Sequence, residues 1–232
     1  MRKPAVTTHK LIFDNLSLDI VDYATSSTPQ IVRKEMIKNC YNIDSIKFSP
    51  NDVMIDIGAH VGIVSIYVAK KYPFVKIYAF EPIPDNYEHL TANLRLNDVY
   101  NVVPHNLAVT SDGRKFDMLV NFANNSGGAT GHLRDMRLSN HFYYVVDSIP
   151  FDNIFDNYDI TACKLLKIDC EGTEHEIIRG TRYLNRIEYL SGEFHINNHL
   201  AEQGYSIETL ITYCRKFIPD NKLKIKPIRM AE

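Results

Sequence analysis

Short apolar runs alternate with amphipathic stretches along the chain, and the alternation becomes regular from residue 52 onward. Val53–Asp56 and Val75–Phe80 have the composition and length of buried strands, and Ile63–Lys71 between them has the apolar spacing of a helix. Further strands are predicted at 102–103, 115–120, 143–146, 165–169, 187–195 and 223–225, and further helices at 85–97, 151–155, 173–179 and 207–217. Strands that alternate with helices in this way predict an α/β fold with a doubly wound, mostly parallel sheet.

The first 50 residues follow a different pattern. Leu11–Phe13 and Leu16–Val21 predict two short strands around the turn-prone pair Asp14–Asn15, and 27–41 predicts a moderately amphipathic helix. We therefore expect residues 1–50 to form an N-terminal cap, made of a β-hairpin and a helix, that leans on the main sheet and helps to form a substrate entrance. Residues 51–232 would then form the main domain.

Two later segments bear on the topology. Asp112–Gly113 has the sequence of a hairpin turn, so 115–120 is expected to run back beside the preceding strand. Residues 121–142 are the least regular stretch, and Asn124–Gly131 within it holds three of the ten glycines. This composition predicts either a loop beside the cofactor or substrate or a plain linker between strands.

Composition indicates a globular protein with one core. The chain has 232 residues, of which 45% are hydrophobic and 23% charged, and its net charge of −2 argues against an obligate polyanion-binding protein. The four cysteines show no CxxC spacing, which argues against a zinc or redox motif and for reduced thiols. No apolar run is long enough to span a bilayer, and no apolar signal segment follows the basic N-terminus. These features predict a cytoplasmic protein.

The turn after the first regular strand carries the strongest ligand-binding signal. Gly58 and Gly62 frame it, and they would let a ligand approach the backbone where a Cβ would intrude. A dinucleotide site would need a further glycine at position 60, which is His60. S-adenosylmethionine (SAM) carries no phosphate, and its cationic amino-acid portion suits the carboxylate of Asp56. Glu81, at the end of the next strand, can accept both ribose hydroxyls.

A second acidic segment follows a later strand, where Asp169, Glu171 and Glu174 lie close together. The positive end of a helix dipole would explain Glu174 but not the other two acids. Three motifs together resemble the FkbM-type SAM-dependent methyltransferases. They are the Asp-x-Gly-Ala-x-x-Gly turn at 56–62, the Glu-Pro pair at 81–82 and the Lys-Ile-Asp-x-Glu-Gly segment at 167–172. The resemblance covers roughly residues 50–200 and includes the segments around 97, 106–109, 126–127 and 193–195.

This resemblance implies a class I SAM-methyltransferase (Rossmann-like) fold. It also implies methylation of a hydroxyl on a sugar or other small metabolite, so the expected partner is a small-molecule or glycan acceptor. The residues that it implies for SAM binding are Asp56, Gly58, Ala59 and Gly62 at the methionine end, Glu81 at the ribose, Asn106 and Ala108 beside the adenine, Asp169 at the methyl-transfer end, and His60, Pro82, Asn86 and Ser126 without a more specific role.

A hydroxyl becomes a good nucleophile only when a base takes its proton. Asp169, Glu171 and His195 are the candidates for this catalytic base, and the sequence leaves the choice open. Glu193 and His195 are two positions apart on a predicted strand, so they point to the same side and can orient one another. Acids could also hold a divalent cation, but the third ligand would be distant in the sequence and no metal motif is recognisable, so no metal is expected.

Two other functions stay open at this stage. RNA (tRNA) methyltransferases share the fold, but the mildly acidic net charge and the lack of an appended RNA-binding module argue against a nucleic-acid partner. A non-catalytic SAM-fold binding protein is the second alternative, and the acids at three strand ends argue against it. An NAD-dependent enzyme fails on the missing glycine.

Overall fold

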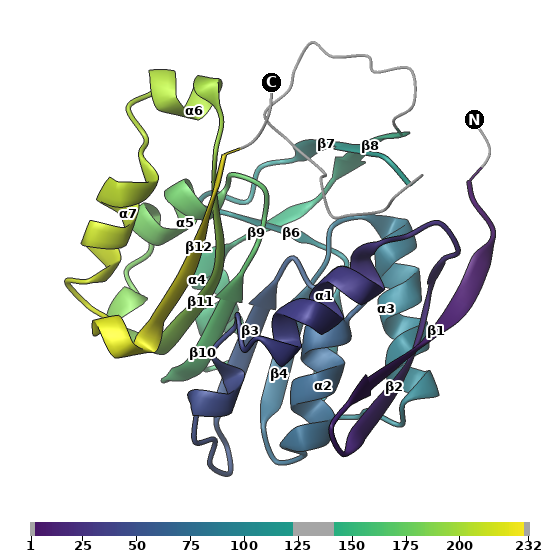
Figure 1. The fold of residues 1–232 in the computed structure, drawn as a ribbon. Coiled ribbons are helices and arrows are strands. Elements are labelled where there is room, and N and C mark those ends of the chain that lie inside the picture. The colour runs from purple at the N-terminus through teal and green to yellow at the C-terminus, as the bar shows by residue number, and fades with distance from the viewer. Residues whose placement is uncertain (1–2, 123–141, 230–232) are drawn as a thin grey trace.

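A six-stranded sheet forms the centre of the computed structural model, which describes residues 3–122 and 142–229 (Figure 1). Its strands are β3 (Val53–Ile57), β4 (Lys76–Phe80), β5 (Val102–His105), β10 (Cys163–Ile168), β11 (Ile187–Ile196) and β12 (Leu223–Arg229). They lie in the order β12-β11-β10-β3-β4-β5, and each neighbouring pair is parallel. The predicted doubly wound α/β fold is confirmed.

Helices cover both faces of the sheet because its strands are apolar on both sides (Figure 1). One face carries α2 (Ile63–Lys71) and α3 (Pro84–Leu96), and the other carries α4 (Phe151–Asn157), α5 (Glu174–Gly180) and α7 (Ile207–Cys214). Met54 belongs to the first hydrophobic cluster and Ile55 to the second. Consecutive strand residues thus point into different layers, as the two-residue period of a strand requires.

The remaining helical elements are short. Apart from the ten-residue helix α1 (Thr28–Ile37), those in the described part of the chain are α6 (Asn198–Glu202) and three 3-10 turns at Ile43–Ser45, Leu184–Arg186 and Asp220–Lys222. Across the part of the chain that the structure describes, no helix combines the length and the apolar character needed to cross a membrane.

The direction of winding changes between β3 and β10. From β3 the chain moves outward to β4 and then β5, whereas from β10 it moves outward in the opposite direction to β11 and then β12. A crevice opens at the carboxyl ends of two such strands, and ligands of parallel sheets usually bind there. The loops that follow β3 and β10 flank this crevice.

The first 50 residues contain the predicted hairpin and helix, namely β1 (Val6–Phe13), β2 (Leu16–Tyr23) and α1 (Thr28–Ile37). The hairpin packs on α2 and α3 rather than directly on the sheet. The side-chain amide of Asn93 on α3 pairs with the N–H and C=O of Val21 at 2.7 and 3.0 Å, and that of Asn97, the C-cap of α3, pairs with those of Asp19 at 3.1 and 2.8 Å. These two amides take the place of a neighbouring strand. The division into a cap and a main domain stays a prediction.

The hairpin predicted at Asp112–Gly113 is wrong. The four strands of this region are β6 (Ala108–Thr110), β7 (Phe116–Val120), β8 (Phe142–Val146) and β9 (Ser148–Pro150). β6 pairs in parallel with β9, and β7 pairs antiparallel with β8. Thr110 Oγ1 accepts the N–H of Gly113 at 2.9 Å and lies 2.9 Å from Ser148 Oγ. The turn is therefore real, but its strand partner arrives 38 residues later. The loop predicted at 121–142 lies, except at its two ends, outside the described residues.

Candidate active site

The loop after β3 touches the loop after β10 directly. The N–H groups of Gly58 and Ala59 both donate to Phe80 O, at 3.0 and 2.9 Å, and the N–H of Asp169 donates to Ile57 O at 3.1 Å. Gly58 has a φ of +76°, and a Cβ added there would lie 1.8 Å from the carbonyl oxygen of Asp169. The glycine thus permits the close approach of two loops.

Packing against α3 likewise explains the glycine at position 62. Its φ is +88°, and an added Cβ would lie 2.3 Å from Leu90 Cδ1 on α3. The expectation that Gly58 and Gly62 leave room for a ligand needs correction, because the space beside them is filled by Asp169 and Leu90. Gly58 still lines the cavity described below, whereas Gly62 does not.

A buried ion pair lies behind the first loop. Asp56 and Lys167 are register partners on β3 and β10, and Lys167 Nζ lies 3.1 Å from Asp56 Oδ1. Ser65 Oγ on α2 donates to Asp56 Oδ2 at 2.7 Å, and Lys167 Nζ donates to Gly58 O at 2.6 Å. Burial lowers the pKa of Lys167, but the charges of Asp56 and Asp169 and the hydrogen bond to Asp56 together outweigh it, so the net pKa lies above the usual value. Asp56 is fully buried and does not line the cavity; Lys167 does.

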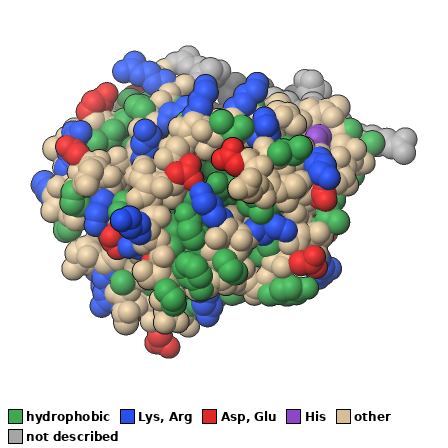
Figure 2. Space-filling view, turned by 60° about the horizontal axis from the view of Figure 1, so that its bottom comes forward, with side chains coloured by type: hydrophobic (Ala, Val, Ile, Leu, Met, Phe, Trp, Pro, Cys, Tyr) green, Lys and Arg blue, Asp and Glu red, His purple; other side chains and the backbone are tan. Residues whose placement is uncertain are grey.

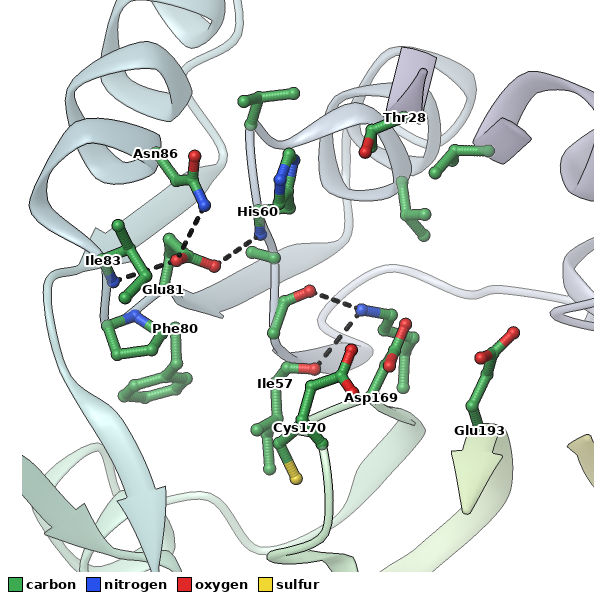
Figure 3. Close-up of a pocket in the computed structure, with 18 of the residues that line it drawn as sticks. Thr28, Ile57, His60, Phe80, Glu81, Ile83, Asn86, Asp169, Cys170 and Glu193 are labelled. Atoms are coloured by element: carbon green, nitrogen blue, oxygen red, sulfur yellow. Dashed lines mark hydrogen bonds between the residues drawn. The ribbon is translucent and has the colours of Figure 1, made fainter. Parts of the chain in front are cut away.

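A cavity of about 390 Å³ occupies the crevice between the two loops. Figure 3 shows Glu81, Asn86 and Ile83 on one side of it and Asp169 and Glu193 on the other. Helix α1 and Lys226 of β12 also contribute to its wall. The cavity therefore has two chemically distinct ends, which we call the Glu81 end and the acidic end; the acidic end comprises Asp169, Glu171, Glu174, Glu193 and His195.

At the Glu81 end, one carboxylate is fixed by backbone donors (Figure 3). Glu81 Oε2 accepts the N–H of His60 at 2.8 Å, and Oε1 accepts the N–H of Ile83 at 3.0 Å and the side-chain amide of Asn86 at 3.4 Å. Burial raises the pKa of Glu81, and these donors oppose that rise. A carboxylate has about four acceptor positions, of which these donors occupy three, so Oε2 can still accept one hydrogen from a ligand in the cavity.

His60 adds an imidazole without hydrogen-bond partners for its ring nitrogens in the described residues. Its φ is +52°, which is uncommon for a residue with a side chain. Both ring nitrogens are buried, and neither has a hydrogen-bond partner within residues 3–122 and 142–229. Since buried polar atoms are normally paired, a cavity-lining imidazole of this kind indicates a polar ligand.

At the acidic end, His195 lies among four carboxylates. Its side chain is 3% exposed, and its Nδ1 lies 2.9 Å from Glu174 Oε1. Nε2 lies 3.6 Å from Glu171 Oε2, 3.7 Å from Glu193 Oε2 and 4.0 Å from Asp169 Oδ1. These three distances exceed that of a hydrogen bond.

The titration of this end follows from burial and from mutual repulsion. Burial, together with the charges of Asp169, Glu174 and Glu193, raises the pKa of Glu171 to about 8, although His195 opposes the rise. Burial also raises the pKa of Asp169. For His195, burial acts to lower the pKa, but the hydrogen bond and charge of Glu174 and the charges of Glu171 and Asp169 raise it to about 9. Within this end, His195 is the residue that can carry positive charge.

Besides these two ends, one wall of the cavity is formed by segments that are far apart in sequence. Glu35 on α1 accepts hydrogen bonds from Lys226 Nζ on β12 at 3.0 Å and from the Tyr41 hydroxyl at 2.8 Å. Lys226 also pairs with Glu193 at 2.6 Å. Helix α1 is thereby tied to β11 and β12 across the cavity.

The structure divides the site residues predicted from sequence into three groups. Those that line the cavity are Gly58, Ala59, His60, Glu81, Pro82, Asn86, Ala108, Asp169 and Glu171. Those that do not line it are Asp56, Gly62, Asn106 and His195; the exposed Asn106 donates its amide to the carbonyls of Glu81 and Pro82. Ser126 lies outside the described residues. The roles of all these residues stay predictions.

Sequence reasoning missed several cavity residues. Lys167 had a signal, because a lysine inside an otherwise apolar strand needs a buried partner. Glu35, Tyr41 and Lys226 had none, since they lie in terminal segments without a recognisable motif. Likewise, the prediction of no metal depended on spacing along the chain, whereas the fold brings Asp169, Glu171 and His195 together.

Comparison with known proteins identifies the family. Residues 56–214 match the family described as the methyltransferase FkbM domain, which is more than half of the chain. Methyltransferase sdnD of Sordaria araneosa is 28% identical over 65% of this chain and 68% of its own length. The 31-O-demethyl-FK506 methyltransferase FkbM of Streptomyces tacrolimicus is 30% identical over 32% of this chain and 28% of its own. Hexuronic acid methyltransferase AglP of Haloferax volcanii is 24% identical over 62% and 56%.

Solved structures give weaker similarities. Precorrin-6y C5,15-methyltransferase from Geobacter metallireducens has a TM-score of 0.40 and 17% identity, over 66% of this chain and 57% of its own. M. jannaschii TYW2, solved in complex with AdoMet, has a TM-score of 0.34 and 18% identity, over 63% and 86%. These scores carry no argument about this chain. The family match and the observed α/β topology do, and on them the chain belongs to the FkbM methyltransferase family.

Proposed function

We propose that the protein transfers a methyl group from SAM to a hydroxyl oxygen of a sugar or another small metabolite. Membership of the FkbM family supports SAM as the methyl donor. Among the relatives, one is named for 31-O-demethyl-FK506 and another for hexuronic acid, both small hydroxylated molecules. This chain spans only 28% and 56% of those two proteins, so its acceptor is a proposal that its own cavity must support.

The Glu81 end fits the nucleoside part of SAM. The cavity volume of about 390 Å³ lies within the range of small-molecule sites. Glu81 Oε2 has acceptor capacity left for a ribose hydroxyl, and the position of the carboxylate is fixed by the donors from His60, Ile83 and Asn86. The unpaired ring nitrogens of His60 offer a donor and an acceptor to the polar groups of the same ligand. Ala108 and Pro82 add apolar contact area.

The acidic end fits the methyl acceptor. When bound, SAM supplies an electrophilic methyl group, and the chain must position a hydroxyl oxygen and let its proton leave. Asp169 and Glu171 line the cavity, and their carboxylates accept hydrogen bonds from hydroxyl groups. His195 lies directly behind them and fixes their surroundings through Glu174. Several carboxylates around one opening suit a polyhydroxylated acceptor.

One observation carries the proposal: a single cavity has a donor-fixed carboxylate at one end and the acidic cluster at the other. The loop after β3 joins the two ends, since His60 donates to Glu81 while Gly58 contacts Asp169. A dinucleotide site would instead use the free N–H groups of this loop for phosphate, but those of Gly58 and Ala59 already donate to Phe80.

The ion pairs of the C-terminal lysines and the face shown in Figure 2 do not favour the RNA alternative. Lys222 pairs with Glu188, and Lys226 pairs with Glu35 and Glu193. On the face shown in Figure 2, basic side chains are interspersed with acidic and apolar ones rather than gathered in one patch. Nucleic-acid binding needs an uncompensated basic surface.

Calorimetric titration with SAM, S-adenosylhomocysteine and NAD tests the cofactor. We expect saturable binding of the first two and none of NAD. Turnover is then measured with a panel of hydroxylated acceptors, comparing the wild type with Asp169→Asn and Glu171→Gln. Loss of turnover with unchanged SAM affinity would support the assignment of the acidic end. Absence of SAM binding, or full turnover in both variants, would contradict the proposal.

A further inference from the structure

We propose that Asp169, Glu171 and His195 form a binding site for one divalent transition-metal cation at the acidic end of the cavity. One donor atom from each side chain lies within 4.8 Å of the other two. Asp169 and Glu171 follow β10, and His195 lies near the end of β11, so two adjacent parallel strands hold the three ligands. The two carboxylates line the cavity, which leaves positions on the ion open to a ligand there.

The orientation of His195 is the first support. Glu174 is fully buried and accepts the N–H groups of Cys170 and Gly172, both at 2.9 Å. Its Oε1 is then fixed 2.9 Å from His195 Nδ1, which donates its hydrogen to it. With Nδ1 directed to Glu174, Nε2 is aimed at the carboxylates of Asp169 and Glu171, and a bound ion would replace the proton that Nε2 carries when the imidazole is charged. Carboxylate–imidazole pairs of this kind orient histidine ligands in metal sites.

The missing donors are the second, independent support. His195 is 3% exposed, yet its Nε2 makes no hydrogen bond to any residue in 3–122 or 142–229. In the same residues, no hydrogen bond reaches the carboxylates of Asp169 or Glu171, in contrast to Glu174 and Glu81. The neighbouring lysines make their ion pairs with other acids, Lys167 with Asp56 and Lys226 with Glu35 and Glu193, although the charge of Lys167 also acts on Asp169. A cation among these three side chains would satisfy all of them.

The donor set indicates the type of ion. Metal–ligand bonds of about 2.0–2.3 Å place neighbouring donor atoms about 3–4 Å apart. The Nε2 distances to Glu171 and Asp169 are 3.6 and 4.0 Å, so small rotations of the two carboxylates, which border open space, complete the geometry. One imidazole with two carboxylates suits Mn²⁺ or Zn²⁺ better than Mg²⁺, which prefers oxygen ligands alone.

The use of the ion in catalysis rests on the proposed function, whereas its binding does not. An acceptor hydroxyl would coordinate the ion through its oxygen, and the positive charge would weaken the O–H bond. The hydroxyl proton passes to water, the oxygen forms a bond to the transferred methyl carbon, and the bond from that carbon to the donor sulfur breaks. The ion keeps its oxidation state throughout, so no oxidant or reductant is required.

Mn²⁺ titration of the full chain tests the site without SAM or acceptor. The protein is first stripped with a chelator, and free Mn²⁺ is followed by electron paramagnetic resonance. We expect one Mn²⁺ per chain and a melting temperature that rises with Mn²⁺ concentration. Glu171→Gln and His195→Gln should each weaken binding at least roughly tenfold. Glu35→Gln is the matched control, since it removes one charge from the same cavity, and it should change Mn²⁺ affinity less than about threefold.

His195→Gln could unfold because it leaves Glu174 buried without its partner, so the partly exposed Glu171→Gln decides the test. No saturable binding of Mn²⁺ or Zn²⁺ by the wild type, or equal binding by wild type and Glu171→Gln, would overturn the site. SAM binding is measured separately. Metal binding without SAM binding would remove the proposed function and keep the site, and SAM binding without metal binding would do the reverse.

Discussion

The carboxylates at the two ends of the cavity differ in the hydrogen bonds that they accept from the chain. At the Glu81 end, both oxygens of one acid accept hydrogen bonds from donors on the adjacent loop and helix. At the acidic end, Asp169 and Glu171 face an imidazole at 3.6–4.0 Å and receive no hydrogen bond from the described part of the chain. The first carboxylate is held rigidly for a ligand with hydroxyl groups. The second pair needs hydroxyl hydrogens or a cation from outside the chain.

From this difference in hydrogen bonding we infer that acidic residues at strand ends serve three purposes in this fold. Asp56 is structural and pairs with Lys167, Glu81 is fixed for recognition, and Asp169 with Glu171 stays available for chemistry. The predictions below separate these purposes, starting with the largest expected effect.

Lys167→Met should destabilise the fold most. It leaves Asp56 fully buried without a counter-charge, which typically costs about 3–5 kcal/mol. Urea unfolding of the variant should show this loss in the free energy of unfolding. The double variant Asp56→Asn/Lys167→Met should recover part of it, because no buried charge is left unpaired. A loss below about 1 kcal/mol in the single variant would mean that Asp56 does not depend on Lys167.

Glu81→Gln should weaken SAM binding while the fold persists. The amide keeps one acceptor oxygen but loses the charge, and a charge-assisted hydrogen bond to a ligand hydroxyl is worth roughly 1.5–3 kcal/mol, or about 10- to 100-fold in affinity. Calorimetry with SAM and S-adenosylhomocysteine measures this change.

Glu171→Gln is the matched comparison, since it makes the same change at the other end of the same cavity. We expect it to alter SAM affinity less than about threefold, because Glu171 belongs to the acceptor end. Equal effects of the two variants would abolish the distinction between the ends.

The residues of the Glu81 end could be predicted from sequence more completely than those of the acidic end, for a physical reason. The Glu81 end is built from loops that directly follow neighbouring strands, so a short motif such as Glu81–Pro82 places its acid correctly. The acidic end needs His195 from the next strand and a wall from Glu35 and Lys226, which are 191 residues apart. No local spacing encodes that contact. The predicted hairpin at 112–113 failed similarly, because the partner of β6 comes from β9.

Asn97→Ala tests whether the N-terminal elements support only one end. The change removes two hydrogen bonds to the backbone of Asp19 and should cost about 1–2 kcal/mol of unfolding free energy. SAM affinity should stay unchanged, because α1 and Glu35 border the acidic end. Arg95→Ala, on the exposed side of the same helix, is the control and should stay within about 0.5 kcal/mol of the wild type. A weaker SAM affinity in Asn97→Ala alone would extend the role of these elements to the Glu81 end.

Asp85→Asn should give the smallest effect, and its pH dependence tests the principle behind the comparison. Asp85, at the start of α3, accepts hydrogen bonds from Lys3, Tyr23 and Tyr144. Burial would raise its pKa, but these donors hold the pKa below its usual value. Its ionised form therefore stabilises the fold above the unfolded-state pKa of about 3.9, and this contribution disappears as the pH falls through the lower folded-state pKa.

Unfolding free energies of the wild type and Asp85→Asn should accordingly differ by less than about 1 kcal/mol at neutral pH, since solvent screens this partly exposed group. The difference should shrink towards about pH 2, where the wild-type carboxyl is also neutral. A difference that persisted there would mean that the shape of the side chain, rather than donor-stabilised charge, accounts for it. Donor count would then no longer explain why Glu81 is held in place while Asp169 and Glu171 stay available.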